Sequence, residues 1–128
     1  MANAAGATPL IRVLIVDDEP DMRLLLRSML GIDQRFEVAG EADNGAEGIE
    51  LFESLRPDVV ILDHRMPVLG GLDAAERILR DHPGQAIVLL SAYIDVALRD
   101  DALALGVRQV VGKQELMDLG PHLLQAIG

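Results

Sequence analysis

The chain has 128 residues, a length that fits one domain with a sizeable core, and half of its residues are apolar. It contains no cysteine, which excludes disulfides, thiolate metal sites and cysteine nucleophiles. The formal net charge of -10 argues against nucleic-acid or membrane binding by this domain. Residues 1–9 are rich in Ala and Gly and lack the pattern of a signal peptide. We therefore expect a short disordered lead-in before a cytoplasmic domain over residues 10–128.

Apolar runs of strand length alternate with amphipathic helical patterns along the chain. The predicted strands cover residues 10–16, 36–40, 59–62, 86–90 and 107–111. The predicted helices cover about 20–30, 45–56, 71–81, 94–105 and 116–127. This alternation predicts an α/β fold in which helices cover both faces of a five-stranded parallel sheet. The strand order cannot be read directly, but the flavodoxin-like order 2-1-3-4-5 is one of two common solutions and the one we expect.

Turn-forming residues set the expected ends of several helices. Gly31 is placed to end the first helix, whereas Asn44 can cap the second, with Glu47 three residues on. Gly106 is placed to end the fourth helix, and Gly120-Pro121 predicts a break in the last. The apolar stripe expected to bury the first helix consists of Met22, Leu25, Leu26, Met29 and Leu30.

Polar side chains follow four of the five predicted strands. Asp17 and Asp18 come after the first strand, Asp63 after the third, Ser91 after the fourth and Lys113 after the fifth. The chosen strand order would bring the three carboxylates together at the switch point of the sheet. Clustered carboxylates repel one another, and Mg²⁺ relieves that repulsion while leaving coordination sites for phosphate oxygens. An ammonium and a hydroxyl suit phosphoryl oxygens, and an Asp carboxylate can act as a nucleophile toward phosphorus.

The sequence resembles the receiver domain of two-component response regulators across about residues 10–127. Four motifs carry this resemblance: Val16-Asp17-Asp18-Glu19-Pro20, Leu62-Asp63-His64-Arg65-Met66-Pro67 with Gly70-Gly71, Leu90-Ser91-Ala92, and Gly106 through Lys113. The resemblance implies that Asp63 accepts phosphate from a sensor histidine kinase or a phosphotransfer protein. It implies that Asp17, Asp18, Asp63 and the backbone carbonyl of Arg65 hold Mg²⁺. Ser91 and Lys113, the only lysine of the chain, would contact the phosphoryl group.

The sequence departs from the family pattern at three places. Receivers usually carry an aromatic residue in the fifth strand that turns inward on activation, where this chain has Val110. The family lysine is usually followed by Pro, often through a cis peptide, whereas Gln114 follows here, and we expect a trans bond. The sequence ends at Gly128 with no output domain, so we expect either a stand-alone or an excised receiver. In receivers the residues at the positions of Arg65 and Tyr93 control access of the attacking water, so the resemblance implies that bulky residues at both shield a longer-lived phosphoryl group.

Two other functions compete with a phosphorylation switch. One is an interaction scaffold of the same fold in which phosphate plays no part, and the complete set of acids, hydroxyl and lysine argues against it. The other is a Mg²⁺-dependent phosphohydrolase, but such enzymes commonly carry Asp-x-Asp at the nucleophile, whereas this chain has Asp63-His64-Arg65. The resemblance also allows a homodimer through the fourth helix, the fifth strand and the last helix. The downstream partner is not indicated by the sequence.

Overall fold

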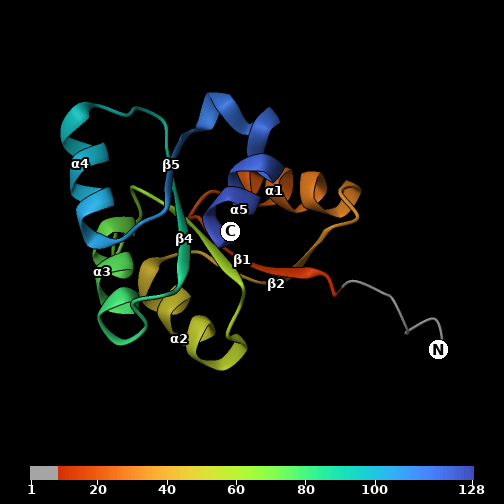
Figure 1. Cartoon of the computed structure of the whole chain (residues 1–128), viewed down its shortest axis with the longest axis horizontal. Helices are drawn as coiled ribbons and strands as arrows, with labels where there is room; N and C mark the ends of the chain where they lie inside the picture. Colours follow the sequence, from red (N-terminus) through yellow and green to blue (C-terminus); the bar gives the residue numbers. More distant parts are fainter. Residues whose placement is uncertain (1–8) are drawn as a thin grey trace.

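The computed structural model describes residues 9–128, and the lead-in predicted for residues 1–9 lies outside this range except for Pro9. Five parallel strands form one sheet in the order β2-β1-β3-β4-β5, which confirms the flavodoxin-like prediction (Figure 1). The strands are β1 (Ile11–Val16), β2 (Phe36–Ala42), β3 (Val59–Asp63), β4 (Ala86–Ser91) and β5 (Gln109–Gly112). β3 and β4 are buried along their whole length, and β1 is buried from Val13 to Val16, as their apolar runs predict.

Five α-helices alternate with the strands and cover both faces of the sheet (Figure 1). They are α1 (Pro20–Ile32), α2 (Gly45–Leu55), α3 (Gly71–Asp81), α4 (Val96–Leu105) and α5 (Leu119–Ile127), and a 3₁₀ segment, Lys113–Asp118, precedes α5. The residues that α1 and α5 bury belong to one apolar cluster, and those of α2, α3 and α4 belong to another on the opposite face. Between residues 9 and 128, none of the helices has the length and apolar character needed to cross a membrane.

Several helix ends fall where the sequence predicts them. Asn44 caps α2, because its side-chain oxygen accepts a hydrogen bond of 2.9 Å from the backbone N–H of Glu47. Gly106 ends α4 at φ 107°, a left-handed conformation that glycine adopts without strain. The peptide bond between Lys113 and Gln114 is trans, as expected. These features are local, and therefore sequence patterns are sufficient to predict them.

Three local predictions are wrong. Gly31 lies inside α1, which continues to Ile32 and is followed by Asp33. Leu25 is 44% exposed, because the buried stripe of α1 is narrower than predicted and centres on Leu26 and Leu30. The break before the last helix comes at residues 113–118 rather than at Gly120-Pro121, which lies in the first turn of α5. A proline in the first turn of a helix removes no helical hydrogen bond, so it does not interrupt α5.

The loop between β3 and α3 is held in place by backbone hydrogen bonds and close backbone contacts. The backbone N–H of Gly71 donates to the carbonyl of His64, and the N–H of Gly45 donates to the carbonyl of Leu69, both at 3.0 Å. A Cβ at Gly71 would lie 2.3 Å from the Asp63 carbonyl oxygen, and one at Gly45 would lie 2.4 Å from that of Leu69. Only glycine permits these approaches, which hold the loop after Asp63 against α2 and α3.

Candidate functional site

All the polar side chains predicted for the site lie at the carboxyl-terminal edge of the sheet. Asp63 and Ser91 are the last residues of β3 and β4, Asp17 and Asp18 directly follow β1, and Lys113 directly follows β5. Because all five strands are parallel, these ends meet at one edge. The strand order places β1 and β3 side by side, and this adjacency brings the three carboxylates together.

The acidic side chains form a compact cluster. Asp17, Asp18 and Asp63 each present a carboxylate oxygen within 4.8 Å of the other two. Asp17 is 1% exposed and Asp63 is 4% exposed, so water screens their charges poorly. Such a cluster needs positive charge nearby, and one source of that charge is a side chain of the protein itself.

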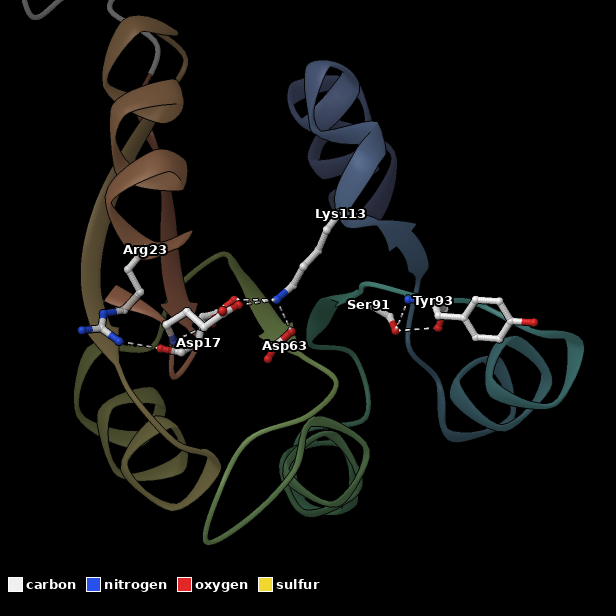
Figure 2. Close-up of polar contacts among 7 residues, drawn as sticks. Asp17, Arg23, Asp63, Ser91, Tyr93 and Lys113 are labelled. Atoms are coloured by element: carbon white, nitrogen blue, oxygen red, sulfur yellow. Dashed lines mark hydrogen bonds and ion pairs between the residues drawn. The ribbon is translucent and has the colours of Figure 1, made fainter. Parts of the chain in front are cut away.

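Lys113 supplies this charge (Figure 2). Its Nζ lies 2.8 Å from Oδ1 of Asp63 and 3.4 Å from Oδ2 of Asp17. It also lies 3.4 Å from Oε1 of Glu19, whose side chain is 63% exposed. The ammonium thus joins the ends of β1, β3 and β5, although Lys113 and Asp17 are far apart in the sequence.

Burial and the neighbouring charges together shift the pKa values of these groups. Burial raises the pKa of Asp63 to about 6, and the charge of Asp17 adds to that rise while the hydrogen bond from Lys113 opposes it. Burial also raises the pKa of Asp17. Burial lowers the pKa of Lys113, but its hydrogen bond to Asp63 and the nearby carboxylates outweigh that effect and raise the value to about 12. Lys113 is therefore an ammonium wherever Asp63 titrates.

The donor set fits a hard divalent cation. Oδ1 of Asp17 accepts a hydrogen bond of 2.9 Å from the backbone N–H of Glu19, whereas the buried Oδ2 makes no hydrogen bond and has only the Lys113 ammonium nearby, at 3.4 Å. A buried carboxylate oxygen without a hydrogen bond is costly, and one ammonium shared with Asp63 and Glu19 leaves room for a further cation to satisfy it. With Asp18 and Asp63 nearby, the available ligands are all oxygens, the atoms that Mg²⁺ prefers. An acidic cluster of this kind is typical of the magnesium site of receiver domains.

Arg23 of α1 binds the backbone at the first acid of the cluster. Arg23 Nη1 donates a hydrogen bond of 2.7 Å to the backbone carbonyl of Asp17, as Figure 2 shows. Arg23 also lies 3.5 Å from the carboxylate of Glu41, which pairs in addition with Arg27. This network fixes the backbone at the first acidic residue. Sequence reasoning did not identify Arg23, because an arginine on the polar side of a helix gives no sign that it reaches a buried carbonyl.

Ser91 faces its own loop rather than the acids. Its hydroxyl donates to the backbone carbonyl of Tyr93 at 2.7 Å and accepts from the Tyr93 N–H at 3.3 Å. The Tyr93 side chain is 76% exposed, and in Figure 2 its ring points away from Asp63 and Lys113. Tyr93 nevertheless lines the cavity in front of Asp63, and the shielding expected from it and from Arg65 stays a prediction.

A cavity of about 500 Å³ lies in front of Asp63. Its lining includes Asp18, Glu19, Arg65, Ser91 and Lys113, so it contains nearly all the predicted residues. Asp17 is buried and is not part of this lining. Arg65 is an exposed residue of the loop after β3, next to the cavity. The space suits a small polar group held between carboxylates and an ammonium.

Glu19 is the second site residue that sequence reasoning did not identify. It follows the two acids and precedes Pro20, so its position beside the site could be foreseen. Its contact with Lys113 could not be foreseen, because the two residues are 94 positions apart and the contact depends on the side-chain conformation of both.

Comparisons with known proteins agree with this geometry. The family model described as "Response regulator receiver domain" matches residues 13–124. The chain is 38% identical to the chemotaxis protein CheY of Thermotoga maritima over 102 residues, which are 80% of this chain and 84% of that protein. It is 47% identical over 87 residues to a protein-glutamate methylesterase/protein-glutamine glutaminase of Geobacillus kaustophilus, covering 68% of this chain but only 25% of that relative.

Solved structures show the same architecture. The response regulator domain of Thermotoga maritima CheB superposes with a TM-score of 0.86 at 29% identity, covering 93% of this chain and 97% of that chain. A response regulator receiver domain protein from Clostridium thermocellum gives a TM-score of 0.84 at 30% identity, covering 92% and 94%. With its five-stranded order, its acidic cluster and Lys113, the chain is a phosphoacceptor signalling domain of the two-component type rather than a classical enzyme. It belongs to the response regulator receiver domain family.

Proposed function

We propose that Asp63 accepts a phosphoryl group from a sensor histidine kinase or a phosphotransfer protein in a Mg²⁺-dependent reaction. The observation that supports this most directly is the placement of Asp63. Its buried carboxylate lies at the end of β3, is bonded to the Lys113 ammonium at 2.8 Å, and faces a cavity large enough for a phosphoryl group. As part of this proposal, the domain acts in the cytoplasm.

The residues of this chain have separate parts in the proposed reaction. One Asp63 oxygen attacks the phosphorus, a P–O bond forms, and the P–N bond to the donor histidine breaks with its electron pair left on the imidazole. With a pKa of about 6, Asp63 is mostly ionised at neutral pH and is ready as a nucleophile. The Lys113 ammonium and, after rotation, the Ser91 hydroxyl donate to the phosphoryl oxygens.

Asp17, Asp18, Asp63 and the backbone carbonyl of Arg65 would hold the Mg²⁺ ion. When bound, the ion neutralises charge on the transferring phosphoryl group. The buried Oδ2 of Asp17, which makes no hydrogen bond and has the Lys113 ammonium 3.4 Å away, supports this assignment. Phosphorylation would then change how the face of α4, β5 and α5 binds a partner or a second copy of the domain.

The test is the intact mass of the protein after incubation with acetyl phosphate and Mg²⁺. We expect the addition of one phosphoryl group to the wild type and of none to Asp63→Asn, while Asp73→Asn, an exposed acid of α3, should behave as the wild type. Normal modification of the Asp63→Asn variant would refute the assignment of the acceptor. A wild type that is never modified would favour a scaffold in which phosphate plays no part.

A further inference from the structure

Glu19 is a third carboxylate on the ammonium of Lys113, in addition to the buried acids of the site. Its Oε1 lies 3.4 Å from Nζ, and its side chain is 63% exposed, whereas Lys113 is only 15% exposed. Glu19 precedes α1 at the N-cap position, yet its side chain makes no capping hydrogen bond to that helix. An acid at a helix N-terminus would ordinarily interact with the free N–H groups there, so its approach to Lys113 calls for another explanation.

The backbone of Glu19 belongs to the same arrangement. Its N–H donates to Oδ1 of Asp17 at 2.9 Å, which orients that carboxylate, while its side chain reaches over the site to Lys113. Glu19 also lines the cavity in front of Asp63. An anionic donor that enters the cavity therefore meets the Glu19 charge, and its phosphoryl oxygens compete with Glu19 for the same ammonium.

We propose that Glu19 is a positioning residue that holds Lys113 in the unphosphorylated protein and weakens the binding of anionic phosphodonors. This proposal rests on the proposed function of Asp63. Binding of the donor draws the ammonium from Glu19 to the phosphoryl oxygens, so the cost of that exchange falls on donor binding rather than on the chemical step. Removing the charge of Glu19 lowers that cost. Exposed ion pairs contribute about 0.2–1 kcal/mol, which corresponds to an effect of up to about fivefold.

The first experiment measures the rate of Asp63 phosphorylation against acetyl phosphate concentration at fixed Mg²⁺. For Glu19→Gln we expect the concentration for half-maximal rate to fall about twofold to fivefold while the maximal rate changes little. Asp21→Asn is the matched control, because Asp21 is an exposed acid in the first turn of α1 and makes no contact with Lys113. Equal responses of the two variants, or a change confined to the maximal rate, would overturn the proposal.

The second experiment needs no phosphorylation. Lys113 is the only lysine, so labelling with lysine carrying ¹⁵N at Nζ gives one side-chain NMR signal from this residue. We expect Glu19→Gln to shift that signal and Asp21→Asn to leave it unchanged. An unshifted signal in both variants would refute the contact itself, whereas failure of the wild type to be phosphorylated would refute only the proposed function.

Discussion

Lys113 donates to Oδ1 of Asp63 over 2.8 Å, yet this ion pair does not give Asp63 the low pKa of a typical paired carboxyl. Burial and the neighbouring Asp17 outweigh the ammonium, and the pKa of Asp63 rises to about 6. Ionisation of Asp63 therefore lowers the free energy of unfolding when no metal ion is bound. Binding of Mg²⁺ or protonation of Asp63 would relieve the repulsion among the carboxylates.

This repulsion predicts how the effect of Asp63→Asn on stability depends on pH. The folded pKa of about 6 exceeds the ordinary value of 3.8, so the contribution of Asp63 to the free energy of unfolding falls as pH rises from about 4 to about 6. In Mg²⁺-free buffer, the free energy of unfolding of Asp63→Asn should rise by about 1–3 kcal/mol relative to that of the wild type as the pH goes from 4 to 7. Urea unfolding at both pH values checks this, with Asp73→Asn as an exposed control. A difference that stays constant with pH would contradict it.

The arrangement of the main elements follows from patterns that the sequence carries locally. Unbroken apolar runs identify the buried strands, and each ends on a polar residue because the chain leaves the core there. The position of Asp63 could therefore be predicted, as could its neighbours at the same edge. The strand order needed the general topology of doubly wound sheets, because no single residue encodes it.

Contacts between side chains that are distant in sequence could not be predicted. The approach of Glu19 to Lys113 and the bond from Arg23 to the Asp17 carbonyl each depend on a rotamer selected by the assembled fold. The exposure of Leu25 was mispredicted for a related reason. Helical spacing shows that α1 has an apolar face, but not how much of that face the neighbouring elements bury. These features require tertiary packing.

The support of Asp17 by Arg23 gives a prediction about Mg²⁺ affinity. Arg23 and Arg27 both pair with Glu41, but only Arg23 also donates to the Asp17 carbonyl. Arg23→Ala should weaken Mg²⁺ binding about tenfold, because groups behind the ligands orient them, whereas Arg27→Ala should weaken it much less. The rise in thermal midpoint across a Mg²⁺ titration reports both affinities. Equal losses of Mg²⁺ affinity in the two variants would show that the ion pairs with Glu41, and not the hydrogen bond to the Asp17 carbonyl, support the site.

Val68 lies in a strained turn of the loop after β3. Its φ is 69°, its side chain is 82% exposed, and the N–H of Leu69 donates to the carbonyl of Pro67 across it. A β-branched residue rarely adopts this left-handed conformation, and exposed Val68 gains little packing in return. Val68→Gly should therefore raise the free energy of unfolding by about 0.5–1 kcal/mol in urea titrations. Val96 is 75% exposed and begins α4, so Val96→Gly should lower the free energy of unfolding instead. A lower free energy of unfolding in both variants would contradict the strain at Val68.

The conformational response to phosphorylation should centre on Tyr93. In receivers the hydroxyl at the position of Ser91 moves toward the phosphoryl group, and an aromatic ring of the fifth strand fills the space it leaves. Here Ser91 is bonded to the carbonyl of Tyr93, and the fifth strand offers only Val110, which is small, 6% exposed and restricted in rotamer. Movement of Ser91 must break the bond to Tyr93, whereas Val110 cannot shift a large apolar volume.

Amide exchange with and without beryllofluoride and Mg²⁺ tests this response. A ligand shifts a two-state equilibrium only by its differential affinity for the two states, so a small packing difference at Val110 should give a small change over β5. We expect changes in protection at residues 91–96 and modest changes at residues 109–112, with none in Asp63→Asn treated in the same way. Large changes centred on Val110, with none near Tyr93, would show that the fifth strand switches without its aromatic residue and would refute the role of Tyr93.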